Sequence, residues 1–261
     1  MRGREPQPGA ISGMRLYLYH EVASTNDVLK EKALAGEPEG SVVLADRQSH
    51  GRGRYGRTWL SSPGKGLTFS LLLRPAASGL SPGLLALSAS MAIVDTLQGQ
   101  CRVTARVKWP NDIYIDHAKV AGILVDVLYQ NHQLVYAVVG VGINLFYTAT
   151  ELQEFGLSAT SLQMHCKKKL DKSQLFEKLI KAMLKGYHLL SRPEQQQRLM
   201  DKWCQSCLHI HRPVIAKSHD ESLSGIFTGV DVNGAALIEL NTGEIAVINS
   251  GDYSLQEDTC F

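Results

Sequence analysis

Residues 42–73 read VVLADRQSHGRGRYGRTWLSSPGKGLTFSLLL, and this stretch decides the fold. Its two ends, residues 42–45 and 67–73, are apolar runs that predict buried strands. Between them lies the basic loop, residues 51–59, in which three arginines are interspersed with glycines and a tryptophan closes the segment. Glycine lets the backbone approach a ligand closely, successive N–H groups can bind an anion, and guanidinium groups hold phosphate or carboxylate oxygens bidentately. The loop therefore predicts a site for a small, multiply charged anion.

Arginine–glycine repeats also occur in flexible RNA-binding tails, which is the alternative interpretation of the basic loop. Such tails have low-complexity flanks, whereas this loop is flanked by two strand-like segments. The net charge of the whole chain is only +2, so its basicity is local and electrostatic steering onto nucleic acid is not expected.

Length and composition limit the architecture. The chain has 261 residues, which suggests one large domain or one large and one small domain, and its 44% hydrophobic content allows a substantial core. No apolar run approaches the roughly 20 residues of a transmembrane helix, and no signal peptide is evident, so we expect a cytoplasmic protein without a membrane partner. Five cysteines at irregular spacing fit a reducing cytosol better than a disulfide framework.

The pattern along the chain divides it into three parts. Residues 1–13 are polar and lack periodicity, so we expect a disordered tail or a vector remnant outside the fold. Residues 14–209 alternate strand-like and helix-like segments, with strands at 16–20, 103–109, 113–115, 120–129 and 133–143 and helices at 24–35, 81–97, 173–188 (capped by Ser173) and 193–207. Residues 210–261 carry short alternating segments with turns at Asn233-Gly234 and Thr242-Gly243, which predict a small β-domain.

The second informative segment is KWPND, residues 108–112. Pro110 cannot continue a central strand, which leaves Lys108, Asn111 and Asp112 at a strand edge or turn. Lys119 then enters the next strand, where Gly122 permits close approach of a ligand or of another backbone. Considered singly, Lys119 has the alternative interpretation of an ordinary surface lysine whose stem lies along apolar residues.

The third segment is GVGINL, residues 140–145, in which two glycines end an apolar strand. A flat group could pack on the bare backbone there, and the amide of Asn144 could pair with an amide-like edge. The segment is not a dinucleotide fingerprint, because the third glycine, the following helix and the acidic residue are absent. Taken alone, it is typical of a strand that simply twists and stops.

Together these segments resemble the biotin protein ligase family, the biotin–acetyl-CoA-carboxylase ligases. The matching blocks occur in order over residues 16–145 and are Ser24-Thr25-Asn26, Gln48 with GRGRYGRTW, KWPND, KVAGIL and GVGIN. Lipoate ligases and octanoyltransferases share the fold class, but their pattern carries an Arg-Arg…Ser-Gly-Gly-Gly loop that this chain lacks. The resemblance implies an α+β protein: a mixed β-sheet with helices mainly on one face, plus a small C-terminal SH3-like β-barrel.

The resemblance also implies an ATP-dependent ligase. It would form biotinyl-5′-AMP and pyrophosphate, with Mg²⁺ bound alongside ATP near Asp112. It would then transfer biotin to a lysine of the biotin carboxyl carrier protein of acetyl-CoA carboxylase. The implied catalytic residues are Lys119, Arg52 and Arg54. The implied biotin-binding residues are Ser24, Thr25, Asn26, Gln48, Gly51, Arg52, Trp59, Lys119, Gly122, Gly140 and Gly142. The implied ATP-binding and adenylate-binding residues are Arg52, Arg54, Arg57, Lys108, Asn111, Asp112, Lys119 and Asn144.

Two departures from the family pattern qualify the expectation. Tyr55 stands where another basic residue often occurs, which lowers the charge of the basic loop by one. Some members carry an N-terminal helix-turn-helix and act as repressors, whereas nothing of that kind precedes residue 14, so we expect no repressor activity and no DNA partner. The expected state is a monomer or weak homodimer.

The rival interpretations are a lipoate–protein ligase and a non-catalytic binder of nucleotide or RNA. A zinc site at Cys204, Cys207, His209 and His211 is not favoured, because four ligands spaced so tightly rarely converge in a tetrahedron. The run Lys167-Lys168-Lys169 is typical of a solvated face.

Overall fold

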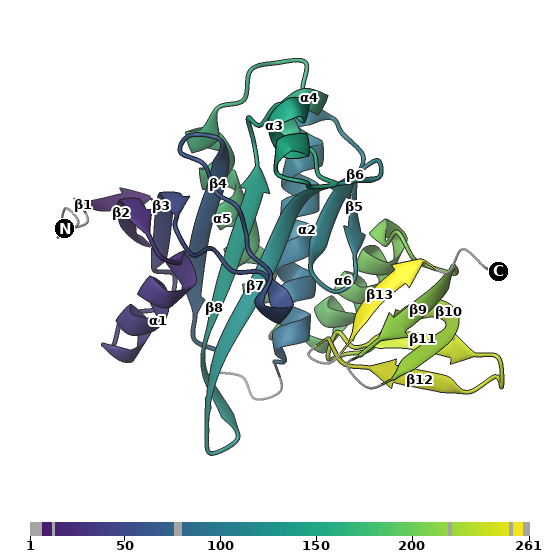
Figure 1. Cartoon of the computed structure of the whole chain (residues 1–261). Helices are drawn as coiled ribbons and strands as arrows, with labels where there is room; N and C mark the ends of the chain where they lie inside the picture. The colour runs from purple at the N-terminus through teal and green to yellow at the C-terminus, as the bar shows by residue number, and fades with distance from the viewer. Residues whose placement is uncertain (1–6, 12–13, 76–79, 219–220, 251–252, 258–261) are drawn as a thin grey trace.

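The computed structural model, shown in Figure 1, describes residues 7–11, 14–75, 80–218, 221–250 and 253–257. It confirms the α+β class, with an eight-stranded mixed sheet and a separate five-stranded antiparallel sheet. The elements of the first part are β1 (Gln7–Ile11), β2 (Met14–Val22), α1 (Thr25–Leu34), β3 (Val42–Gln48), the 3₁₀ turn η1 (Arg54–Gly56), β4 (Gly66–Leu73), α2 (Pro82–Cys101), β5 (Ala105–Lys108), β6 (Asp112–Ile115), β7 (Ala118–Gln130) and β8 (Gln133–Asn144). The remaining elements are α3 (Ala149–Glu154), α4 (Leu162–His165), α5 (Lys172–Leu189), α6 (Pro193–Ser206), β9 (Pro213–Lys217), β10 (Ser222–Val230), β11 (Ala236–Leu240), β12 (Ile245–Ile248) and β13 (Ser254–Glu257).

The large sheet has the strand order β1-β2-β3-β4-β8-β7-β6-β5. Strands β2 and β3 are parallel and all other neighbours are antiparallel, so the sheet is mixed as expected. Strands β7 and β8 run through its middle, which agrees with their nearly continuous apolar sequences.

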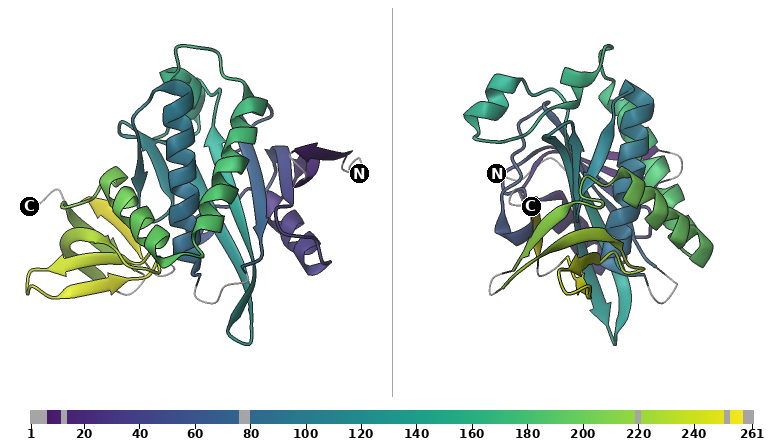
Figure 2. Two further views of the ribbon diagram at one scale, coloured as in Figure 1. Left: turned by 180° about the vertical axis from the view of Figure 1, so that it is seen from behind. Right: turned by 90° about the vertical axis from the view of Figure 1, so that its right-hand side faces the viewer.

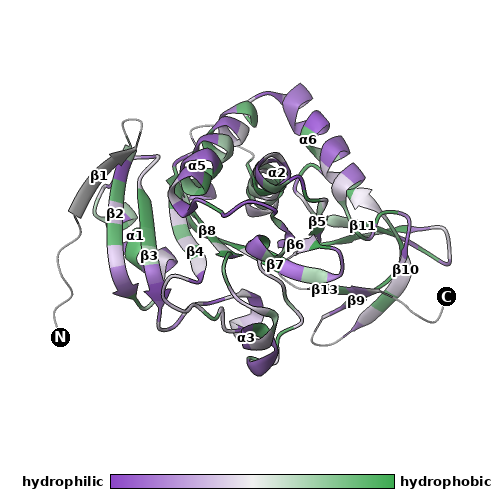
Figure 3. Cartoon of the chain, turned by 90° about the horizontal axis from the view of Figure 1, so that it is seen from above, coloured by the Kyte–Doolittle hydropathy of each residue, from purple (hydrophilic) through white to green (hydrophobic). Residues whose placement is uncertain are grey.

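Alternate residues of the strands point to two different cores. On β4, Leu71 and Leu73 belong to the main core, whereas Leu72 belongs to a smaller core with Leu29 of α1. Helices α2 and α5 cover the main face, and α1 covers part of the opposite face (Figure 2). Figure 3 shows α5, α2 and α6 along one side of the sheet. The candidate site lies beside α1 on the same face of the sheet.

The N-cap residue predicted from the sequence is right for α2 and wrong for α5. Helix α2 begins as predicted, because the Ser81 hydroxyl accepts a hydrogen bond from the Leu84 N–H at 3.0 Å. The predicted Ser173 cap of α5 is wrong: the carboxylate of Asp171 accepts hydrogen bonds from the N–H groups of Ser173 and Gln174 at 2.9 and 3.0 Å. Asp171 stands at the N-cap position, from which one oxygen reaches two free N–H groups. None of the described helices is long and apolar enough to cross a bilayer.

The N-terminal segment differs from the expectation that residues 1–13 lie outside the fold. Residues 7–11 form β1, which pairs antiparallel with β2, with Gln7 opposite Leu18 and Ile11 opposite Met14. An edge strand is held by backbone hydrogen bonds on one side only, so it needs no apolar alternation in its sequence. Residues 1–6 and 12–13 of the expected tail lie outside the described residues.

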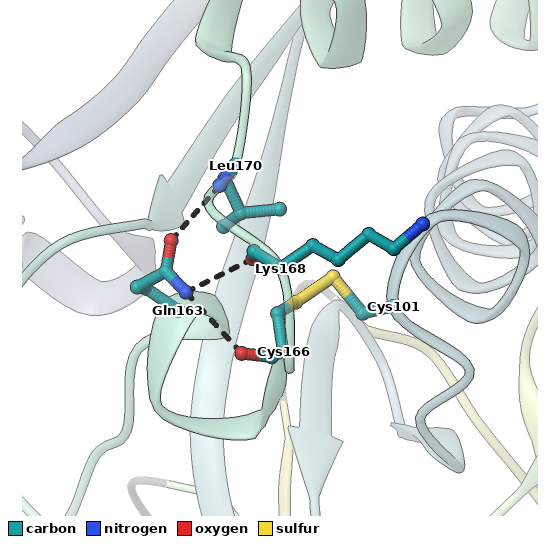
Figure 4. Close-up of a disulfide and its surroundings, with 5 residues drawn as sticks. All are labelled: Cys101, Gln163, Cys166, Lys168 and Leu170. Carbon is teal, nitrogen blue, oxygen red and sulfur yellow. Dashed lines mark hydrogen bonds between the residues drawn. A yellow bond between two sulfur atoms is a disulfide. The ribbon is translucent and has the colours of Figure 1, made fainter.

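A disulfide joins Cys101 at the end of α2 to Cys166 after α4 (Figure 4). It corrects the expectation of a chain without disulfides, and the two Cα atoms are 4.9 Å apart, within the normal range for a bridge. The cysteines are 65 residues apart, so their spacing carries no signal of a disulfide. Gln163 organises the same turn, since its side chain donates to the carbonyls of Cys166 and Lys168 and accepts from the Leu170 N–H at 2.9 Å.

The C-terminal sheet has the order β12-β11-β10-β9-β13, and its short antiparallel strands confirm the expected SH3-like β-domain. Residues 219–220, 251–252 and 258–261 of this expected domain lie outside the described residues. The predicted Asn233-Gly234 turn docks against the start of α2. The Ser81 hydroxyl donates to the Asn233 carbonyl at 2.7 Å, and the buried indole of Trp109 donates to the Gly234 carbonyl at 3.1 Å.

This junction requires glycine at position 83. A Cβ on Gly83 would overlap the Asn233 carbonyl oxygen, whereas a Cβ on Gly99 of the same helix would meet nothing within 4 Å. We expect Gly83→Ala to lower the free energy of unfolding by about 1–3 kcal/mol through overpacking. We expect Gly99→Ala, the matched control, to raise it by about 0.5–1 kcal/mol through helix propensity. Urea unfolding followed by circular dichroism measures both, and equal effects of the two substitutions would contradict the tight junction.

Candidate active site

A cavity of about 380 Å³ lies beside α1 on the same face of the sheet, bordered by the basic loop, by the turn between β5 and β6, and by residues 157–159. Every residue that the sequence analysis assigned to the site lines this cavity, except Gly51. These residues are Ser24, Thr25, Asn26, Gln48, Arg52, Arg54, Arg57, Trp59, Lys108, Asn111, Asp112, Lys119, Gly122, Gly140, Gly142 and Asn144. Segments that are far apart in the sequence therefore meet at one place.

The floor of the cavity is bare backbone on the two central strands. Gly122 of β7 lies opposite Gly142 of β8, and Leu124 lies opposite Gly140, so the three glycines share one face of the sheet. A Cβ on Gly142 would lie 2.6 Å from the indole nitrogen of Trp59, and a Cβ on Gly140 would lie 2.9 Å from the amide carbon of Asn26. Both distances are shorter than any real packing contact, so side chains rest directly on the strands and only glycine fits beneath them.

A buried polar network closes the end of the cavity nearest α1. The side-chain oxygen of Gln48 accepts hydrogen bonds from the N–H and the hydroxyl of Thr25, at 2.7 and 3.0 Å. Ser70 of β4 lies within 2.8 Å of the Thr25 hydroxyl and 2.6 Å of the Asn26 amide oxygen. Each of these side chains is at most 9% exposed, so their orientations are fixed by their partners. Sequence reasoning missed Ser70, although a serine within the apolar run 67–73 was the signal that could have found it.

The basic loop is folded back on itself and is not an open coil. The N–H of Gly53 donates to the Arg57 carbonyl at 2.7 Å, and the N–H of Trp59 donates to the Gly51 carbonyl at 2.9 Å. A Cβ on Gly51 would overlap the Trp59 carbonyl, so this glycine supports the loop from behind the cavity. Arg52 forms an ion pair with Asp27 of α1 and lies 3.8 Å from Asp126 of β7.

The tip of the basic loop contacts the C-terminal domain. Tyr55 adopts a left-handed backbone conformation with φ of 55°, and its hydroxyl donates to the Tyr253 carbonyl at 2.6 Å. The Arg54 guanidinium donates to that hydroxyl at 2.7 Å and stacks 4.6 Å from the ring centre. Leu255 and Gln256 of β13 also line the cavity. Sequence reasoning assigned the C-terminal domain no part in the site, because no motif there resembles a ligand-binding segment.

Lys119 lies at the centre of the charged wall. Its ammonium group forms an ion pair with Asp112 at 2.6 Å and lies 5.6 Å from the ring centre of Trp59. The strand register explains why Lys119 and Asp112 are close. Across β6 and β7, Asp112 lies opposite Gly122 and Tyr114 lies opposite Lys119. Burial raises the pKa of the Tyr114 phenol, and the Asp112 carboxylate raises it further, while Arg57 acts in the opposite direction.

Two asparagines are held by backbone carbonyls. The Asn111 side chain donates to the Ile123 carbonyl at 2.7 Å, which braces the turn after Pro110. The Asn144 side chain is 7% exposed and donates to the Thr160 carbonyl at 3.1 Å. The Thr160 N–H in turn donates to the Lys119 carbonyl at 2.9 Å. Residues 157–159, to which the sequence pattern assigned no element, are thereby fixed as a wall of the cavity.

The cavity is strongly positive. Among the described residues that line it, Arg52, Arg54, Arg57, Lys108 and Lys119 are basic, and Asp112 is the one acidic residue. Fixed cations in a partly desolvated cleft attract anions more strongly than the same charges in water. The arrangement suits a ligand that combines a neutral part beside the side chains on the glycine floor with several negative charges at the basic wall.

The packing of Trp59 on the glycine floor gives a direct test. Trp109 and Trp203 are 2% and 0% exposed, so Trp59 is the tryptophan that a quencher can reach. We expect Gly142→Ala to displace the indole and to increase acrylamide quenching of tryptophan fluorescence. Gly99→Ala should leave quenching unchanged, and Trp59→Phe should remove the quenchable component. Unaltered quenching in Gly142→Ala would show that the indole does not rest on this strand.

Comparisons with known proteins agree with this geometry. Residues 19–144 match the biotin/lipoate A/B protein ligase family, and residues 209–255 match the biotin protein ligase C-terminal domain. The bifunctional ligase/repressor BirA of Bacillus subtilis is 31% identical over 248 residues, which cover 94% of this chain and 75% of that protein. The biotin–[acetyl-CoA-carboxylase] ligase of Mycobacterium tuberculosis is 28% identical over 255 residues, which cover 95% and 92%.

A solved structure extends the similarity to three dimensions. The biotin protein ligase from Aquifex aeolicus in complex with biotin and ATP superimposes with a TM-score of 0.80 at 30% identity, over 93% of this chain and 99% of that one. Sequence similarity, fold and the residues of the cavity therefore lead to the same conclusion. The chain belongs to the biotin protein ligase family.

Proposed function

We propose that this protein activates biotin with ATP as biotinyl-5′-AMP and transfers the biotinyl group to a lysine of a biotin carboxyl carrier domain. The observation that carries the proposal is the meeting of Lys119 and the arginines of the basic loop beside a floor of bare glycines in one cavity. Related proteins named as biotin ligases, and a related structure with biotin and ATP bound, support the same reading.

The first step brings two anions together. A carboxylate oxygen of biotin attacks the α-phosphorus of ATP, the bond to the bridging oxygen breaks, and pyrophosphate leaves with the bonding electron pair. Arg52, Arg54 and Lys119 would offset the repulsion between carboxylate and phosphate and stabilise the charge of the transition state. In the structure, Arg52 and Lys119 are paired with Asp27 and Asp112, so the ligand anions must compete with these carboxylates.

The neutral end of the cavity suits the ureido ring of biotin. We assign Ser24, Thr25, Asn26 and Gln48 to this ring, because they are buried polar side chains beside the glycine floor. The Gln48 carbonyl oxygen is already engaged by Thr25, which leaves its amide donor for the ligand. Trp59 would lie along the valeryl tail, and the floor is formed by Gly122, Gly140 and Gly142, with Gly51 behind the loop.

The basic end of the cavity suits ATP. Arg57, Lys108 and Asn111 would contact phosphate oxygens, and Asn144 would lie at the adenine. Mg²⁺ bound with ATP takes most of its ligands from phosphate and water, so a single protein carboxylate suffices. Asp112 is the acidic residue among the described residues that line the cavity and would hold the ion, which would neutralise phosphate charge.

The second step needs a nucleophile from outside the chain. The ε-amino group of a carrier lysine would attack the mixed anhydride, and AMP would leave. Relatives named as biotin–[acetyl-CoA-carboxylase] ligases suggest the carrier of that enzyme as the acceptor. Other relatives are named as bifunctional ligase/repressors, so the expected absence of DNA binding stays a prediction for a gel-shift assay.

Removal of the Lys119 charge tests the proposed reaction centre. We expect Lys119→Gln to lower the rate of biotin-dependent ATP–pyrophosphate exchange by about 10²- to 10³-fold, as is typical for loss of one transition-state contact. Lys172→Gln is the matched control, because Lys172 pairs with Asp46 at 3.3 Å and does not line the cavity. Unchanged exchange in folded Lys119→Gln protein would exclude the assigned role.

The choice of acid separates the proposed function from its rivals. In the same exchange assay with wild-type protein, we expect biotin to support exchange and lipoate and octanoate to give only background. Exchange with lipoate alone would assign the protein to lipoate ligation. Absence of exchange with every acid, in folded protein that binds ATP, would favour a non-catalytic nucleotide binder.

A further inference from the structure

A second cavity, of about 510 Å³, lies between strands β5 and β6 and the C-terminal domain. We call it the basic groove, because its lining includes Arg106, Lys108, His117 and Arg212 and a single carboxylate, Asp116, among the described residues. It shares Lys108, Tyr114 and Gln256 with the candidate active site, so the two cavities are contiguous. Figure 1 shows this end of the large sheet facing β13.

Strand register places the groove in line with the proposed reaction centre. Tyr114 of β6 pairs with Lys119 of β7 on one side and with Arg106 of β5 on the other. Residues directly opposite on antiparallel strands point to the same face, and their Cα atoms are about 5 Å apart, so Arg106 lies about 10 Å from Lys119. Lys108 occupies the next position on β5 that points to this face, and its backbone lies opposite that of Asp112 in the strand register.

The basic side chains on β5 have few acidic partners. Arg52 and Lys119 have carboxylate partners, whereas Arg106 and Lys108 form no ion pair with any of the described residues. The Lys108 ammonium instead lies 5.5 Å from the ring centre of Tyr114. Asp116, the carboxylate of the groove, is 77% exposed and lies 3.9 Å from His165 on α4. Neighbouring cations without counter-charges repel one another, and a bound multivalent anion would relieve that repulsion.

We propose that the basic groove binds inorganic pyrophosphate as it leaves the reaction centre, with Arg106 and Lys108 as its principal contacts. The inference rests on the proposed function, since the pyrophosphate is the group released when the bond between the α-phosphorus and its bridging oxygen breaks. The basic loop and Lys119 keep the adenylate, while the departing anion moves sideways along β6 and β5. The groove thus gives the leaving group a route that does not cross the glycine floor.

Direct binding of inorganic pyrophosphate to the full chain, without biotin or ATP, tests the site by isothermal titration calorimetry. We expect Arg106→Gln to raise the Kd for pyrophosphate about tenfold, the effect of one lost hydrogen bond to a charged group. Arg106→Lys should retain most of the binding. The control is Arg198→Gln, an exposed arginine of α6 that lines neither cavity, and it should leave the Kd unchanged.

A kinetic readout completes the test. In forward turnover, Arg106→Gln should weaken product inhibition by pyrophosphate and leave the KM for biotin unchanged. An unchanged pyrophosphate Kd in Arg106→Gln would overturn the proposal. A higher KM for the carrier protein with unaltered pyrophosphate binding would also overturn it and assign the groove to an acidic surface of the carrier. Because the binding measurement needs no turnover, failure of the ligase function would appear separately, as absence of biotin-dependent exchange.

Discussion

The contact between side chains and bare backbone on β7 and β8 is the constraint on which the rest of the site depends. Asn26 belongs to α1 and Trp59 to the basic loop, and both rest on glycines of strand β8. Any larger residue at positions 140 or 142 would push these side chains outward. The places of Trp59 in the basic loop and of Asn26 in α1 therefore both require glycine on β8.

Charge distribution is the second determinant of the site. Carboxylates of α1 and β7 stand behind Arg52, and Asp112 stands beside Lys119, so two of the cations are held in place by internal partners. Arg106 and Lys108 lack such partners within the described part of the chain. Arg52 and Lys119, the paired cations, border the glycine floor, and Arg106 and Lys108 lie further out. The first two are preorganised by their carboxylate partners, whereas the other two can take up an anion.

The sequence was sufficient for the parts of the structure that depend on local pattern. Apolar runs located β4, β7 and β8, and Ser81-Pro82 located the start of α2. Nearly every residue that the motifs assigned to the site also lines the cavity, because each motif sits on one of the strands or loops that converge there. Contacts between distant segments could not be read in the same way. The Cys101–Cys166 bridge, the edge strand β1 and the wall at residues 157–159 depend on spatial proximity, which leaves no periodic signal.

The contact of Tyr55 with the Tyr253 carbonyl has a consequence for how the two sheets are related. Together with Leu255 and Gln256, it makes the smaller domain part of the wall that surrounds the ligand. A domain boundary between α6 and β9 separates two sheets, but residues from both sides of that boundary line the candidate active site. The C-terminal domain is therefore not an interchangeable module. A replacement from another protein would have to reproduce this short stretch of backbone before the larger domain could hold its basic loop in place.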